Sequence, residues 1–307
     1  MDFSLIGAGI RLSTPLTFAA IGGLYSERSG IFNIALEGIL LFGAFGGAVA
    51  AYYTGSPWAG FICAMLCGFM ASLIHAIITI IFRADQIISG IGINILALGL
   101  PGLLSSTMFG TPSSTPPVVK WFKPVNISWI ERIPIAGEIF SGHSILVYFS
   151  FIVVVITFVI FRETRFGLRI IASGENPSAL EVAGISVVKY RFYGVLLSGI
   201  LGGAGGAYLS ISHGTQFIKN MSAGRGYIAL AALILGKWKP VPVFLACLLF
   251  GFADALQIRL QGKFGIPVEF IQMIPYILTI LILAGFIGKA IPPKASGKPY
   301  YRGGEKL

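Results

Sequence analysis

The sequence contains few charged residues and few cysteines. Asp, Glu, Lys and Arg make up 11% of its 307 residues, whereas soluble domains carry about 25%, which argues against a water-soluble enzyme. The three cysteines, Cys63, Cys67 and Cys247, lie in apolar runs, so they predict neither a disulfide framework nor a metal site. No basic segment precedes the first apolar stretch, and we therefore expect no cleavable signal peptide.

Motifs for catalysis and nucleotide binding are also missing. The sequence has no GxxxxGK[ST] loop, its three histidines lie far apart, and no two carboxylates stand at a catalytic spacing. We therefore expect no catalytic residues, no bound cofactor or metal and no enzymatic activity in this chain. If it moves a solute uphill, the energy must come from an ion gradient or from another subunit.

What the sequence does contain is long apolar runs. Hydrophobic residues make up 55% of it, and the mean hydropathy is +0.85. Because a bilayer needs about 20 apolar residues per helix, we predict an all-α polytopic membrane protein with residues 1–307 as one domain. The eight predicted spans lie near 4–24, 31–53, 57–82, 87–108, 143–161, 191–213, 241–260 and 271–289. A further segment, 226–236, is too short to cross as an ordinary helix, so the total is eight or nine segments depending on whether it is counted.

The net charge of +10 follows from membrane topology. With the N-terminus outside, most Lys and Arg residues fall in cytoplasmic loops, including the dense cluster at 162–191 and the C-terminal tail. The loop from about 109 to 142 then lies outside. No basic groove with interleaved aromatic residues is present, so we expect the lipid bilayer as a partner and no nucleic acid.

The cytoplasmic segment 162–190 predicts one short helix, about 177–183. Asn176 is a favourable N-cap, Pro177 suits the first helical position, and Gly184 can end the helix in a left-handed conformation. Helices this short are marginal in water. A docking partner could hold it, or it could pack on its own span. Local physics leaves both alternatives open.

Two pairs of polar residues share helix faces within the spans. Asn33 and Glu37 are four residues apart, and Glu37 lies about 9 Å inside its span, near the inner gate. It is either a structural carboxylate at a helix break or part of a solute path. Asp254 and Gln257 form the second pair. Asp254 could form an ion pair with Arg11 or Arg259, or line the path.

Single polar residues and glycines give further expectations. Asn94, His213 and Gln216 could each bond a solute or a neighbouring helix. The pairs Gly199/Gly203 and Gly202/Gly206 predict close helix packing. Segment 226–236 resembles half of a broken helix, a feature of transporter solute sites that often occurs in inverted repeats. Ile228-Ala-Leu-Ala weakly echoes Ile34-Ala-Leu-Glu, which suggests such a repeat.

Several segments resemble one family. They are Ser26-Glu-Arg-Ser-Gly-Ile-Phe-Asn-Ile-Ala-Leu-Glu-Gly38, Gly174-Glu-Asn-Pro-Ser-Ala-Leu-Glu-Val-Ala-Gly-Ile185, Gly226-Tyr-Ile-Ala-Leu-Ala-Ala-Leu-Ile-Leu-Gly236, Gly251-Phe-Ala-Asp-Ala-Leu-Gln257 and Pro275-Tyr-Ile-Leu-Thr279. Together they resemble nucleoside-type permeases of ATP-binding cassette (ABC) importers, within the branched-chain amino acid and simple-sugar permease family. Leu180 departs from the coupling motif, which usually repeats Ala there, so the register of that helix stays open.

The resemblance implies a multi-pass permease of the bacterial inner membrane. Its partners would be a second, homologous permease, cytoplasmic ATPases that use ATP and Mg²⁺, and an extracytoplasmic substrate-binding lipoprotein. The coupling motif implies ATPase-docking residues: Glu175, Asn176, Pro177, Ala179, Glu181, Ala183 and Gly184. Alternatives are a ribose-like sugar or branched-chain amino acid permease, or an ion-coupled transporter that uses Glu37 or Asp254.

A nucleoside is neutral, so its path needs apolar walls and a few hydrogen-bonding groups rather than a fixed charge. The candidate path residues are Asn33, Glu37, Asn94, His213, Gln216, Asp254 and Gln257. An anionic solute would need a cation within the membrane, and Arg11 is the one plausible candidate that we find in the sequence.

Overall fold

The computed structural model describes residues 4–126, 140–261, 268–274, 277, 280–281 and 290–304. Seven helices in this part of the chain are long and apolar enough to cross a membrane. They are α1 (Ser4–Arg28), α2 (Leu36–Thr54), α3 (Pro57–Ala76) with the π-helix η1 (Ile77–Ile81), α4 (Gln86–Phe109), α7 (Ile145–Glu163), α10 (Val187–Tyr208) with the π-helix η2 (Leu209–His213), and α12 (Pro240–Leu260). Seven predicted spans are confirmed, and the eighth, 271–289, lies largely outside the described residues.

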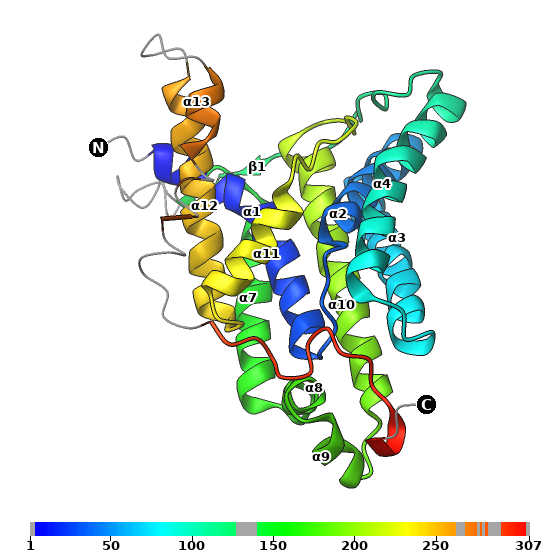
Figure 1. Cartoon of the computed structure of the whole chain (residues 1–307). Coiled ribbons are helices and arrows are strands. Elements are labelled where there is room, and N and C mark those ends of the chain that lie inside the picture. The colour runs from blue at the N-terminus through cyan, green and yellow to red at the C-terminus, as the bar shows by residue number, and fades with distance from the viewer. Residues whose placement is uncertain are drawn as a thin grey trace.

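The shorter elements lie at the two ends of this bundle or within it. Figure 1 shows α8 (Arg165–Glu175), α9 (Pro177–Val182) and the red C-terminal segment with η3 (Arg302–Gly304) at one end. The helix α13 (Val268–Gln272) lies at the other end. The helix α11 (Arg225–Leu235) lies inside the bundle, and β1 (Pro124–Val125) pairs antiparallel with β2 (His143–Ser144). The helix α8 was not predicted.

Glycines bring the central helices into close contact. The helices α1, α2 and α10 are mostly buried, whereas α3, α4, α7 and α12 present apolar side chains outward, as lipid-facing helices do. A Cβ atom on Gly203 would lie 2.3 Å from the Ala64 carbonyl oxygen of α3, and one on Gly206 would lie 2.3 Å from the Leu40 oxygen of α2. The two predicted pairs therefore pack α10 against two different helices.

Two helices begin inside the bundle rather than at its ends. Residues 30–35 are not helical, so α2 begins at Leu36 and not near residue 31. The start of α11 packs on it, because a Cβ atom on Gly226 would lie 2.3 Å from the Glu37 nitrogen. From this meeting point α2 runs towards Phe109, on which Tyr53 stacks, and α11 runs the opposite way. The predicted half-helix is confirmed.

The echo between residues 34–37 and 228–231 does not align these two starts. Ile34 precedes α2, whereas Ile228 already lies within α11. The tetrapeptide match therefore does not mark equivalent positions in the two helices.

Basic loops that are distant in sequence meet on one face of the bundle. Arg28 pairs with Glu175 at 3.3 Å, Arg191 Nη1 donates to the Lys298 carbonyl at 3.0 Å, and Arg83 lies 4.6 Å from the ring centre of Tyr301. We call this end, with α8, α9, the turn 236–239 and the tail 290–304, the basic face. The predicted grouping of segment 162–190 with the tail is therefore confirmed.

At the opposite end, the described part of the predicted loop 109–142 runs along the segment after α10. Backbone hydrogen bonds join Thr115 N to Phe217 O at 3.1 Å, Val118 N to Thr215 O at 2.7 Å and Lys219 N to Ser113 O at 2.8 Å. These bonds fix residues 215–219, which lead to the start of α11.

Candidate solute path and coupling segment

Glu37 caps the start of α11. Its carboxylate accepts hydrogen bonds from Ser222 Oγ at 2.5 Å, Gly224 N–H at 2.8 Å and Gly226 N–H at 2.7 Å. The N-cap residue Gly224 has no side chain, so another part of the chain must satisfy these amides. This geometry favours the structural alternative for Glu37.

Glu37 lies well away from the basic face. The helix α11 has 11 residues and separates Glu37 from the basic face, a distance of about 16 Å at 1.5 Å per residue. That is about half of a 30 Å bilayer core. The prediction near the inner gate assumed helix from residue 31, whereas residues 30–35 are not helical and α2 begins at Leu36.

Asn33 and Asn94 hold the non-helical segment before α2. Asn33 Nδ2 donates to Ser198 Oγ at 2.9 Å. Asn94 Nδ2 donates to the Ile34 carbonyl at 3.0 Å and to the Tyr227 hydroxyl at 3.1 Å, and its Oδ1 accepts from Gly38 N–H at 2.8 Å. These bonds favour the alternative of bonding to a neighbouring helix.

Two residues that sequence analysis did not select support the same segment. Gln86 Oε1 accepts from Phe32 N–H at 2.7 Å, and the buried His75 ring lies 3.3 Å from the Phe32 oxygen. The sequence does show a histidine and a glutamine in apolar helices, and this could have marked them as buried polar residues. Their spacing, however, did not identify Phe32 as their partner.

The four other candidate path residues line two cavities. A cavity of about 440 Å³ contains His213 and Gln216, and we call it the His213 cavity. Its further lining residues are Leu209, Gly214, Thr215, Ile218, Met221 and Arg225. A cavity of about 310 Å³, the Asp254 cavity, contains Asp254 and Gln257. Its further lining residues are Ala223, Arg225, Ile228, Ile258 and Gln272.

Arg225 lines both cavities and was missed as a site residue. Its Nη1 donates to the carbonyls of Met221 and Ser222, at 3.2 Å each, and its positive charge acts on Asp254. The expectation that Arg11 is the one plausible intramembrane cation is therefore wrong. In the sequence, Arg225 only marks the boundary of an apolar segment. The tertiary structure places that boundary inside the bundle.

The short helix α9 has the predicted ends. Asn176 Oδ1 accepts from Ala179 N–H at 3.2 Å, Pro177 is the first helical residue, and Gly184 has φ +73°. Leu180 is buried and points into the protein. The outward surface is formed by small residues and one valine: Ser178, Ala179, Val182, Ala183 and Gly184. This settles the open register of the helix.

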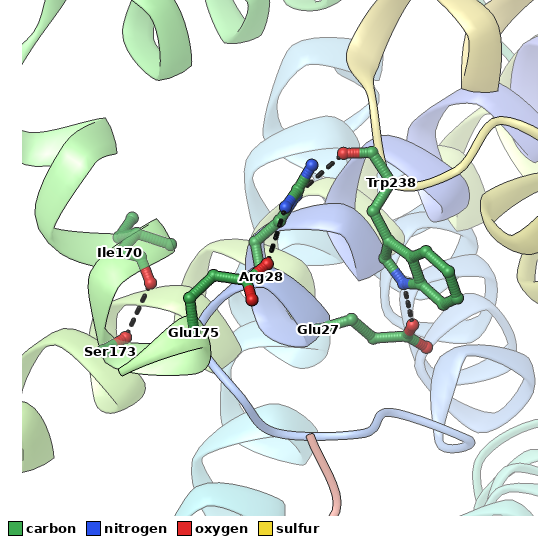
Figure 2. A network of polar contacts seen from close by, with 6 residues as sticks. All are labelled: Glu27, Arg28, Ile170, Ser173, Glu175 and Trp238. Atoms are coloured by element: carbon green, nitrogen blue, oxygen red, sulfur yellow. Dashed lines mark hydrogen bonds and ion pairs between the residues drawn. The ribbon is translucent and has the colours of Figure 1, made fainter. Parts of the chain in front are cut away.

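Glu175, a predicted docking residue, also forms an ion pair within this chain. Figure 2 shows Arg28 between Glu175 and Trp238: Arg28 Nη1 pairs with Glu175 at 3.3 Å, and Nε donates to the Trp238 carbonyl at 2.8 Å. The Trp238 indole N–H donates to the carboxylate of Glu27, which is fully buried. The end of α1 is thereby bonded both to the segment before α9 and to the turn after α11.

The matched family covers most of the chain. Residues 5–283 match the family described as "Branched-chain amino acid transport system / permease component". The chain belongs to this family. The resemblance that the sequence motifs indicated is confirmed, and the permease architecture agrees with the membrane-spanning helices.

Three relatives are similar over most of their length. The guanosine ABC transporter permease protein NupQ of Bacillus subtilis is 41% identical, over 97% of this chain and 97% of the relative. The nucleoside ABC transporter permease protein NupC of Lactococcus lactis is 42% identical, over 94% of both chains. The putative glucose ABC transporter permease protein TsgC13 of Haloferax volcanii is 33% identical, over 84% of this chain and 78% of the relative.

Proposed function

We propose that this permease carries nucleosides across the inner membrane as a subunit of an ABC importer. The observation that carries the proposal is identity of 41% and 42%, over nearly whole chains, to permeases named for guanosine and nucleosides. A permease named for glucose is less similar, at 33%. We therefore prefer a nucleoside over the alternative of a sugar.

The two cavities suit a neutral solute with polar edges. Gln216 and Gln257 offer amide donors and acceptors, and the apolar lining provides a surface for a base. Arg225 adds a positive charge, which Asp254 in the same cavity offsets. Glu37 already occupies the start of α11, a position at which backbone amides attract anions. These features support transport of a nucleoside and rejection of its phosphate esters.

The outward surface of α9 supports a cytoplasmic ATPase as a partner. Its small residues permit close approach by a cytoplasmic ATPase, which would bind ATP and Mg²⁺ while this chain binds neither. A second, homologous permease and a substrate-binding lipoprotein would complete the importer. In this arrangement the basic face is cytoplasmic, the N-terminus lies outside, and the C-terminus lies in the cytoplasm.

The test is uptake by proteoliposomes that contain the permease pair, the ATPase and the lipoprotein. We expect ATP-dependent uptake of radiolabelled guanosine, weak competition by excess ribose and none by guanosine monophosphate. A complex with a catalytically inactive ATPase is the control. ATP turnover driven by ribose or by a branched-chain amino acid, and not by nucleosides, would assign a different substrate. Uptake without ATP that a proton ionophore abolishes would replace the importer with an ion-coupled transporter.

A further inference from the structure

The C-terminal residues 290–304 run across the basic face, past α8 and the end of α10, and finish near α9 (Figure 1). We call them the C-terminal strap. Ala295 N–H donates to the Gly174 carbonyl at 2.8 Å, at the end of α8. Further along, the Lys298 carbonyl accepts a hydrogen bond from Arg191 Nη1 at 3.0 Å, near the start of α10. Backbone groups of the strap therefore bond to two elements that flank α9.

Two tyrosines of the strap contact arginines of the membrane helices. The Tyr300 ring centre lies 5.8 Å from the Arg191 guanidinium, and Arg191 is buried. The Tyr301 ring centre lies 4.6 Å from the guanidinium of Arg83, which follows η1. Cation–π contacts of this kind are stronger where the cation is desolvated. The strap is thus attached to the ends of two spans that pack closely on each other.

Glu181 connects the strap to α9. Its carboxylate accepts from Gly303 N–H at 3.3 and 3.4 Å and lies 3.7 Å from Arg302 Nε. The Tyr300 hydroxyl also bonds to Glu181, and burial, together with this carboxylate, raises the pKa of Tyr300 to about 12. Tyr300 therefore keeps its proton, and remains a donor to Glu181, at physiological pH.

The helix α9 needs such a contact because it is short. It has six residues, and Leu180 is its one buried side chain; helices of this length are unstable alone. A cavity of about 540 Å³ lies between α9 and the strap, with Glu181, Gly184, Tyr300 and Arg302 in its lining. Across this cavity, the Glu181 side chain bonds to Gly303 and pairs with Arg302 of the strap.

We infer that the C-terminal strap fixes α9 on the transmembrane body, with Glu181 as the positioning residue. The strap connects α9 to the ends of α10 and η1, so these elements move together. The consequence for transport rests on the proposed function, because only a docked ATPase would use α9. The placement of α9 itself does not depend on a partner.

The test uses the full-length permease alone, in lipid nanodiscs, with Cys63, Cys67 and Cys247 replaced by Ala. A spin label at Val182→Cys reports on α9, since Val182 is 89% exposed. We expect Glu181→Ala to remove the immobilised component of its spectrum, and termination after Pro293 to do the same. Tyr300→Phe, which removes one hydroxyl, should cause a smaller loss.

Matched controls distinguish loss of the strap contact from a general increase in the mobility of the protein. Glu163→Ala removes an exposed carboxylate on the same face, paired with Arg162 rather than with the strap, and should leave the Val182 spectrum unchanged. A label at Leu168→Cys on α8 should not respond to Glu181→Ala. Unchanged spectra at Val182 in both Glu181→Ala and the truncated chain would overturn the inference.

A second measurement tests the effect of the strap on transport, so that a failure of the proposed function can be told apart from a failure of this inference. In the assembled importer, Glu181→Ala should raise the number of ATP molecules hydrolysed per solute imported, and Glu163→Ala should not. If the wild-type permease fails to copurify with the ATPase, the proposed docking is wrong, while the spin-label result still decides the role of the strap.

Discussion

The carboxylate of Glu37 accepts the Gly226 N–H at 2.7 Å, and this contact joins the first turns of two helices that run in opposite directions. Gly226 permits it because any Cβ atom there would lie 2.5 Å from Glu37 Cα. The positive end of α11 therefore faces a carboxylate of the same chain inside the membrane.

Replacement of Glu37 should destabilise the protein. Glu37→Ala leaves the Ser222 hydroxyl and the amides of Gly224 and Gly226 without their acceptor, and each such buried group costs about 1–3 kcal/mol. Glu37→Gln should lie between Ala and wild type, because one amide oxygen remains. Thermal unfolding of the purified permease measures both. An unfolding temperature equal to that of the exposed control Glu163→Gln would show that the contact contributes little.

The bond between Glu27 and Trp238 predicts a non-additive pair of substitutions. Trp238→Phe leaves a buried carboxyl group without its donor, and Glu27→Leu leaves the indole N–H without its acceptor, at about 1–3 kcal/mol each. The double variant leaves neither group without a partner. Its loss of stability should therefore be smaller than the sum of the losses in the two single variants. A double-mutant cycle from denaturant or thermal unfolding measures this. Strict additivity would mean that the bond does not stabilise the fold.

Substitutions on the outward surface of α9 should separate transport from membrane insertion. Ala183→Glu places a charge on the surface proposed to dock the ATPase. Gly184 has a left-handed backbone conformation, in which a Leu residue (Gly184→Leu) costs roughly 1 kcal/mol or more. Because open space surrounds this glycine, the Leu side chain adds no steric clash to that cost. Both should insert normally and lose uptake. Gly184→Asn, which tolerates that conformation, should keep most of it. Normal uptake with copurified ATPase in both variants would contradict the docking assignment.

Labelling of single cysteines should place the basic face in the cytoplasm. Ser178→Cys and Ser296→Cys should not react with a membrane-impermeant maleimide in intact cells, whereas Ser113→Cys, exposed at the opposite end, should react. Permeabilised cells should allow all three to react. Ser173 is a poor probe because it is fully buried. Ready labelling of Ser178→Cys from outside would reverse the proposed orientation.

Features that depend on neighbouring residues could be predicted well from the sequence. The seven confirmed spans follow from uninterrupted apolar runs, because the bilayer excludes unsatisfied backbone groups over a fixed thickness. Asn176, Pro177 and Gly184 determine the ends of α9 through side-chain capping and backbone conformation. The small residues of α10 also predict close packing, because the size of a side chain can be read directly from the sequence.

The depth and partners of the polar residues required the tertiary structure. Hydropathy places Glu37 about 9 Å inside its span and Arg225 at the edge of a short segment, but both α2 and α11 begin inside the bundle, where Glu37 contacts the start of α11. Asn94 and Asp254 were equal candidates for the solute path. One bonds to the start of α2 and the other lines a cavity. Such contacts join residues that are far apart in sequence, and an apolar sequence permits many such pairings.

The sequence by itself determined that this chain is a helical membrane permease, since apolar length, loop charge and family motifs are properties of the linear chain. The tertiary structure alone decided which carboxylate caps α11, which arginine lines the cavities and how the C-terminal strap contacts α9. The physical reason is that a buried polar group is stabilised only by a partner at hydrogen-bonding distance. Folding, rather than proximity in the sequence, supplies that partner.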